Sequence, residues 1–541
     1  MPPNPTTPRR ALGVTIPLFS LRTHASWGIG EIGDLVPFAR WIAPAGISVV
    51  QMLPLQEISG NETSPYAALS AFGLDPMYIS LRALPELATQ SLAGDEARDL
   101  ERARRAPRVD YATVRRLKSI ALRHACARFV AGDGAPSSSH GNARRAEYEA
   151  FLAAQREWLD DYVLFRALKD AMGGTPWWKW PLALRERHAA AMDDARVRLA
   201  NEIGYHRFAQ WIAHAQWSEM RNGLRAMNVE VMGDLPFMVA RDSADVWAHP
   251  SEFRHDANVG APPDQFDVEG QDWGLPPYHW ERMSQNDFRW LERRARYAGS
   301  LYDRFRIDHV VGLFRTFVRK IGGKIPAGRK LIPGVFDPPD ESRQATHGVR
   351  VVTSMLRGAS TQRSQLIAED LGIIPDFVRP ALAQLGVPGY RVLIWEKDGD
   401  VYRDPTTYPA LSVACFATHD TDSVVTWWEG LTKKERAAVK AIPSWSAAAR
   451  RAHESFDDST HAALLELICS ARSDLVLLLF QDVLGSRDRV NTPGTQGEHN
   501  WTLRLPANIE ELASDRSATA ALARVAAAAR HGGRVTPSPQ S

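Results

Sequence analysis

The stretch FRIDHVVGLF, residues 305–314, has the apolar character of a buried strand but carries three ionisable residues. Arg306, Asp308 and His309 interrupt a run that would otherwise be covered on both faces. Residues two apart in a strand share a face, so Arg306 and Asp308 are expected to point to the same side. A neighbouring guanidinium lowers the pKa of a carboxyl and keeps it charged. An oriented carboxylate can act as a nucleophile, although a plain buried ion pair would give the same pattern.

Seven further short apolar runs resemble this stretch and predict the fold. Amphipathic segments such as 34–46 and 376–387 separate several of the runs and have the pattern of helices. Strands buried on both faces that alternate with helices are typical of a parallel sheet, and eight of them predict an α/β fold, a (β/α)8 TIM barrel. The eight runs are residues 13–19, 47–55, 229–236, 305–311, 364–372, 390–396, 412–420 and 474–482.

The spacing of the runs predicts long insertions in the barrel. Helical patterns at 111–129 and 147–172 fill the gap between the second and third runs, which predicts a helical insertion at about 85–200. The next long connection predicts an active-site loop at about 241–285. The barrel is expected to occupy residues 11–515, between a disordered N-terminal tail (1–10) and a frayed helix with a disordered C-terminal tail (516–541).

Composition argues against several classes of partner and location. The chain has 541 residues and a net charge of +2, too balanced for a nucleic-acid partner or an anionic membrane surface. No apolar run approaches the ~20 residues that span a bilayer. Cys126, Cys415 and Cys469 form neither a CxxC pair nor a metal-binding spacing, so we expect no disulfides and a cytoplasmic location.

Four of the predicted strands end in an acid: Asp234, Asp308, Glu369 and Asp420. Barrel enzymes build their active sites at the C-terminal ends of the strands. One acid there could merely cap a helix, but four buried charges are costly without a function. Glu369 follows apolar residues, which raise a carboxyl pKa and suit a general acid. A charged and a protonated carboxyl about 5–5.5 Å apart form the pair used by retaining glycosidases.

The same residues also allow a metal site. Asp234, Asp308, His309, His419 and Asp420 could coordinate a divalent ion, although the HxH or HxxxH pairing typical of such sites is absent. Nucleotide-binding glycine motifs and GxSxG are absent as well. We therefore expect no metal and no organic cofactor.

A series of longer motifs, in order along nearly the whole chain, identifies a family. They include SWGIGEIGDL (26–35), SPYAALSAFGLDPMYISL (64–81), GDLPFMVARDSADVWAHP (233–250), FRIDHVVG (305–312), AEDLG (368–372), ATHDTDS (417–423) and NTPGTQGEHNW (491–501). With this series, the chain resembles the 4-α-glucanotransferases, also called amylomaltases or disproportionating enzymes, of glycoside hydrolase family 77 in the α-amylase clan.

The resemblance implies a role for each candidate residue. Asp308 corresponds to the family's nucleophile, Glu369 to its acid/base, and Asp420 to a third carboxylate that binds sugar hydroxyls. Substrate-binding or supporting positions are implied for Ser64, Tyr66, Asp234, Gln271, Trp273, Arg306, His309 and His419, and a C-terminal signature near the rim of the site for Asn491, Pro493, Asn500 and Trp501. Trp273, Tyr278 and Trp280 are candidates for stacking on sugars, although the last two would serve equally to clamp their loop.

The implied activity is transfer of α-1,4-glucan segments from a maltodextrin donor to the 4-hydroxyl of an acceptor glucan or glucose. An α-glucan hydrolase using the same carboxylates, or a non-catalytic glucan-binding protein, are the alternatives. The sequence departs from the family's pattern at Leu275, at Thr421 and across residues 315–347. We expect these differences to affect the preferred acceptor and the preferred chain length and to leave the chemistry intact.

Overall fold

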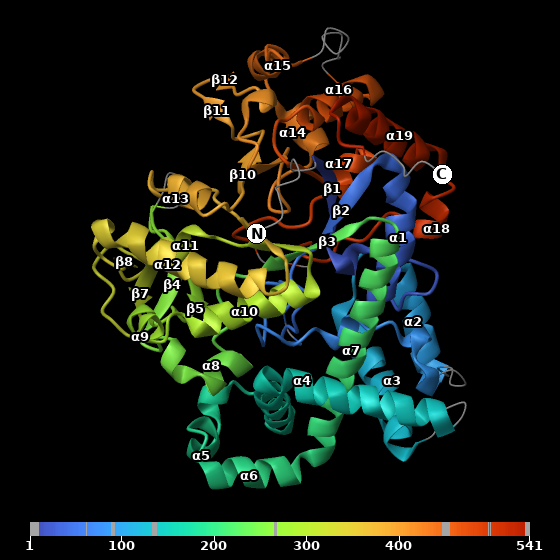
Figure 1. Ribbon diagram of the computed structural model, residues 1–541, viewed down its shortest axis with the longest axis vertical. Helices are drawn as coiled ribbons and strands as arrows, with labels where there is room; N and C mark the ends of the chain where they lie inside the picture. The colour runs from blue at the N-terminus through green and yellow to red at the C-terminus, as the bar shows by residue number, and fades with distance from the viewer. Residues whose placement is uncertain are drawn as a thin grey trace, which may run out of the picture.

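The computed structural model describes residues 10–60, 62–87, 92, 94–132, 138–263, 268–445, 455–495, 497 and 499–535 (Figure 1). Most of the two predicted tails, residues 1–9 and 536–541, therefore lies outside the described residues. No helix in the described ranges is both long and apolar enough to cross a membrane.

Eight parallel strands close into a barrel, which confirms the predicted fold. Each predicted run overlaps one strand, and neighbours in the chain order of these eight strands are neighbours in the barrel. Side chains such as Val49, Met232, Ile367, Tyr390 and Leu477 form the buried cluster inside it. The strands are β1 (Ala11–Thr15), β2 (Ile47–Gln51), β3 (Glu230–Leu235), β6 (Arg304–Ile307), β9 (Gln365–Ala368), β10 (Gly389–Val392), β13 (Ser412–Cys415) and β14 (Leu475–Leu479).

Helices cover the outside of the barrel in the connections between strands. Helix α10, for example, turns an apolar face to the core and a charged face to solvent. The covering helices are α1 (Leu35–Ile42), α10 (Arg289–Leu301), α11 (Val311–Phe314), α12 (Glu341–Ser360), α13 (Val378–Gln384), α14 (Val424–Gly430), α15 (Lys433–Lys440), α16 (Asp458–Cys469), α17 (Phe480–Leu484), α18 (Ile509–Leu512) and α19 (Arg516–His531), with a small hairpin, β11 (Lys397–Asp398) and β12 (Val401–Tyr402), before β13.

The connection between β2 and β3 is a helical layer at one end of the molecule (Figure 1). Long helices of this layer pack on each other, chiefly α4 on α7, and α7 leads back into β3. The helices are α2 (Gly94–Arg105), α3 (Tyr111–Ala131), α4 (Ser138–Ala171), α5 (Leu182–Arg185), α6 (Ala189–Arg198) and α7 (Ala200–Ala226).

A four-stranded antiparallel sheet lies beside the barrel, and two of its strands fall within the predicted active-site loop at 241–285. Its order is β5–β4–β7–β8, with β4 (Ala257–Ala261), β5 (Gln271–Leu275), β7 (Thr316–Lys320) and β8 (Val335–Asp337). The same connection also holds α8 (Ala244–Ala248) and α9 (Trp280–Gln285). The sheet escaped prediction because its outer strands, β5 and β8, are short and largely unburied, so they lack the apolar signature of the barrel strands.

The C-terminal helix is firmly packed, so the expectation of a frayed helix is wrong. One face of α19, including Ala518 and Val525, is buried, and the helix contacts α16. Beyond it, the buried Arg534 donates hydrogen bonds to the carbonyl oxygens of Ala11 (3.0 Å), Cys469 (2.8 Å) and Ser473 (3.0 Å). This end of the chain therefore ties the beginning of β1 to the segment between α16 and β14.

Candidate active site

The register of the barrel brings residues of three neighbouring strands to one place. Asp234 on β3 lies opposite Arg306 on β6, and Ile307 lies opposite Ala368 on β9. Asp308 and Glu369 each follow directly after their strand, so they lie at the same height at the C-terminal end of the barrel. Asp420 lies differently: β13 ends at Cys415, and Asp420 sits in a turn beyond it.

Arg306 is the centre of the charge arrangement. One of its terminal nitrogens, Nη1, lies 2.7 Å from both carboxylate oxygens of Asp234. The other, Nη2, lies 2.8 Å from Oδ1 of Asp308 and 4.0 Å from Oε2 of Glu369. Arg306 thus meets Asp308 on the shared strand face, as predicted, and additionally joins two carboxylates from other strands.

Glu369 has the environment of a general acid. Its carboxyl is buried, and burial raises its pKa to about 8; Arg306 opposes this rise and the charge of Asp308 adds to it. One oxygen, Oε2, accepts a hydrogen bond from the backbone N–H of His309 at 2.6 Å, and Oε1 accepts one from the N–H of Leu371 at 3.2 Å. These two backbone donors fix the orientation of the carboxyl group.

Tyr66, Asp234 and His419 form a hydrogen-bonded group beside the nucleophile candidate. The Tyr66 hydroxyl donates to Oδ2 of Asp234 at 2.7 Å and lies 3.0 Å from Nε2 of His419. The Tyr66 and His419 rings stack with their centroids 5.8 Å apart. The same His419 nitrogen lies 3.5 Å from Oδ2 of Asp420. Ser64 has a local role instead: its hydroxyl accepts a weak hydrogen bond from the Tyr66 N–H at 3.4 Å.

Strand β5 reaches the site through Trp273. The Trp273 ring meets the His309 ring edge-on, with centroids 5.2 Å apart, and its N–H donates to Oε1 of Gln271 at 2.8 Å. Burial lowers the pKa of His309, which therefore stays neutral near pH 7. Tyr278 and Trp280, by contrast, are buried and bond to Phe237 and Thr316. They clamp the segment that follows β5, and their buried rings are not available for stacking on a sugar.

The C-terminal segment supplies contacts that the sequence did not reveal in detail. The Asn491 side-chain amide donates to Oδ1 of Asp420 at 2.6 Å, whereas the sequence placed Asn491 only near the rim. Arg489 was missed entirely; it donates to the backbone oxygen of Asp420 at 2.6 Å and pairs with Asp422 at 2.8 Å. Nothing in the local sequence around Arg489 marks it, because its partners lie on a distant turn.

The alternative metal site does not match the observed clusters. Within the described ranges, the single group of three potential ligands that converge is Asp170, Glu202 and His206, on α4 and α7. Arg123 and Arg166 already pair with the two carboxylates of that group. The residues around Arg306 are arranged as carboxylates about a cation, an arrangement that allows acid–base and nucleophilic chemistry.

Comparison with known proteins agrees with this geometry. The family model described as 4-alpha-glucanotransferase, glycoside hydrolase family 77, matches residues 16–510. The 4-alpha-glucanotransferase of Chlamydia pneumoniae is 32% identical over 518 residues, covering 93% of this chain and 92% of that protein. The enzyme of the same name from Thermus thermophilus is 33% identical over 513 residues, covering 92% and 95%.

A solved structure supports the fold. The amylomaltase from Streptococcus agalactiae in complex with acarbose superposes with a TM-score of 0.82 at 24% identity, covering 98% of this chain and 100% of that one. The chain therefore belongs to the 4-α-glucanotransferase family, glycoside hydrolase family 77.

Proposed function

We propose that this protein transfers α-1,4-glucan segments between maltodextrins by a retaining double displacement at Asp308 and Glu369. In the first step, Asp308 attacks the anomeric carbon of the donor while Glu369 gives its proton to the departing glycosidic oxygen. In the second step, Glu369 takes the proton of the acceptor's 4-hydroxyl, whose oxygen displaces Asp308. Two inversions retain the α configuration, and the Glu369 carboxyl ends the cycle protonated, as it began.

The observation that carries this proposal is the arrangement of carboxylates around Arg306. A guanidinium nitrogen lies 2.8 Å from Oδ1 of Asp308 and orients this carboxylate, as a nucleophile requires. Burial favours the protonated form of Glu369 that a general acid needs. The two carboxyls therefore have different surroundings: Nη2 of Arg306 pairs closely with Asp308 and lies 4.0 Å from Glu369.

The surrounding residues would orient the donor sugar. The side chains that bind the hydroxyls of the reacting sugar are those of Asp420, His419, Asp234 and Tyr66. The polar atoms of these four side chains lie in one connected group. Asp420 is the most exposed of them, with 41% of its side chain accessible. A carboxylate that is open to solvent on one side and held by Asn491 on the other suits the binding of paired hydroxyls.

Transfer rather than hydrolysis requires that water is kept away from the glycosyl intermediate. Trp273 lies against His309, so strand β5, which carries Gln271 and Trp273, is the natural cover. We also propose a cytoplasmic location, supported by the three cysteines, which are all free and buried.

Maltotriose tests the proposal directly. Incubation should yield glucose together with a ladder of longer maltodextrins, whereas maltose and glucose alone would indicate hydrolysis, and no change would indicate a binding protein. Asp308→Asn should abolish the ladder. Asp287→Asn, a change at an exposed acid that pairs with Arg357, should leave it intact. Near-normal transfer by Asp308→Asn would overturn the assignment of the nucleophile.

A further inference from the structure

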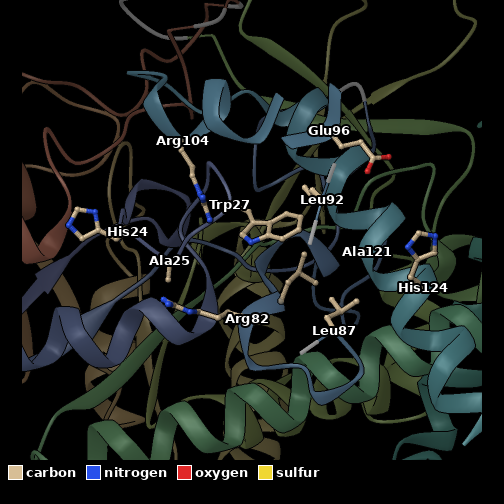
Figure 2. Close-up of a pocket in the computed structure, with 11 residues that line it drawn as sticks. His24, Ala25, Trp27, Arg82, Leu87, Leu92, Glu96, Arg104, Ala121 and His124 are labelled. Carbon is tan, nitrogen blue, oxygen red and sulfur yellow. The ribbon is translucent and has the colours of Figure 1, made fainter. Parts of the chain in front are cut away.

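A cavity of about 460 Å³ lies between the connection after β1, the described residues 81–87 and 92, and helices α2 and α3 (Figure 2). None of the residues that line it belongs to the candidate active site. Its size is in the range of small-ligand sites. Its lining combines apolar side chains, among them Leu81, Leu87 and Ala121, with polar ones, so it resembles neither a dry packing defect nor a purely charged cleft.

Trp27 is the central side chain of this cavity. Its indole is half-buried, packs against the main core, and extends into the cavity between the polar side chains and the leucines (Figure 2). The ring N–H donates to no acceptor among the residues that the structure describes. A flat apolar surface with an unused donor at its edge suits a ligand that has both apolar C–H faces and hydroxyl groups.

The charges around the indole balance. Arg82 and Glu96 line the cavity and form no ion pair within the described part of the chain. Arg104 is already engaged, since its Nε donates to the Ser26 carbonyl at 3.1 Å and its Nη1 contacts Glu101 at 2.8 Å. One available cation and one available anion favour a neutral, hydroxylated ligand over a phosphate, which the Glu96 carboxylate would repel.

The walls of the cavity are held in place before any ligand binds. The backbone N–H of Trp27 donates to Oε1 of Glu31 at 3.0 Å, and Nζ of the buried Lys118 donates to the same oxygen at 2.6 Å. Next to Trp27, Gly28 has a φ of +81°, and a Cβ there would lie 2.8 Å from Cβ of Ala103 on α2. This close approach fixes the connection against α2. A preformed site loses little entropy on binding, so even a small contact area can yield affinity.

We propose that this cavity is a second, non-catalytic α-glucan-binding site that holds one or two glucose units of a long chain on Trp27. The choice of an α-glucan rests on the proposed function; the presence of a site for a neutral, hydroxylated ligand rests on the cavity itself. A chain held at two places returns to the active site faster after each release, because the second contact raises its effective concentration there. The benefit is restricted to glucans long enough to occupy both sites.

Kinetics with short and long donors test this inference. In Trp27→Ala, and in the double variant Arg82→Ala/Glu96→Ala, KM for amylose should rise about three- to tenfold, the range expected for one lost aromatic contact. Transfer from maltotriose should stay unchanged in both. Trp178→Ala removes an exposed tryptophan outside the cavity and should behave as wild type with both donors. Circular dichroism checks that each variant is folded.

Calorimetry counts the sites. In the Asp308→Asn background, which prevents turnover, maltohexaose should bind at two sites, and adding Trp27→Ala should leave one. If Trp27→Ala does not fold, the Arg82→Ala/Glu96→Ala variant decides, because both of its changes lie on the rim. Unchanged KM for amylose and unchanged stoichiometry in the folded variants would overturn the inference. The proposed function fails separately, if the wild-type protein makes no ladder from maltotriose.

Discussion

The raised pKa of Glu369 predicts an unusual alkaline limit for the reaction. Glu369 must be protonated to begin the cycle, and burial raises its pKa to about 8. At that value about nine-tenths of the molecules are ready at pH 7 and about one-tenth at pH 9, whereas an ordinary glutamate would leave well under one-hundredth ready at pH 7. We therefore expect kcat/KM to be level between about pH 6 and 7 and to fall about tenfold per unit above 8.

Initial rates of glucose release from maltotriose below its KM, measured from pH 5 to 10, provide the assay. Circular dichroism at each pH confirms that the protein remains folded, so that any loss reports a titration and not unfolding. The reasoning is refuted if kcat/KM stays level to pH 10, or if its alkaline limb lies near 5, where an unperturbed glutamate titrates.

The same pKa predicts that the Glu369 carboxyl destabilises the folded protein near neutral pH. In the unfolded chain the carboxyl loses its proton near pH 4.5, but in the folded protein it keeps the proton until about pH 8. Folding stability is therefore lost as the pH rises between these two values. Glu369→Gln removes this dependence. The free energy of unfolding of this inactive variant should therefore exceed that of the wild type by about 3 kcal/mol at pH 7 and should equal it below pH 4. Urea unfolding at the two pH values measures the difference, and equal gains at both would contradict it.

Two further variants test contacts away from Glu369. Asn491→Ala deletes the 2.6 Å hydrogen bond to Asp420 and should lower kcat/KM about ten- to hundredfold. The alkaline limb of the pH profile should not shift. A loss of kcat/KM below twofold would exclude a positioning role for Asn491. Arg534→Ala leaves buried carbonyl oxygens without their hydrogen-bond donor and should lower the free energy of unfolding in urea by about 3 kcal/mol or more. Arg530→Ala, at an exposed position of α19, should change it by less than about 0.5 kcal/mol. Equal stability of the two arginine variants would show that Arg534 does not tie β1 to the C-terminal segments.

The barrel could be predicted because its strands are buried on both faces. Such strands are short, uninterrupted apolar runs, and all eight were found from that feature. The β5–β4–β7–β8 sheet could not be found in the same way. Strand β5, QDWGL, has no fully buried residue, and β8 has only three residues, so neither carries a pattern that distinguishes it from a loop. Pairing with β4 and β7, rather than local preference, makes these segments strands.

The candidate site was predictable where an acid ends a strand and less so where the chain turns before the acid. Asp308 and Glu369 follow their strands directly, so the position of the strand places them. Asp420 was expected at a strand end because the apolar run continues through Phe416 and Ala417, which are buried without belonging to β13. Its position depends instead on Asn491, a contact across 71 residues of sequence that no local pattern encodes.

A single guanidinium lies between the carboxylates to which we assign different roles. Arg306 lies 2.7–2.8 Å from oxygens of Asp234 and Asp308 but 4.0 Å from Glu369, and Coulomb attraction weakens with distance. Its attraction is therefore strongest at Asp308 and Asp234, although burial still raises the pKa of Asp234 against it. At Glu369 the weaker attraction is outweighed by burial and by the charge of Asp308, and the proton stays. The Arg306–Asp308 pair in FRIDH thus acts, together with burial, on an acid at the end of the adjacent strand. The barrel register makes this possible, because it sets Asp234, Asp308 and Glu369 around the two terminal nitrogens of Arg306.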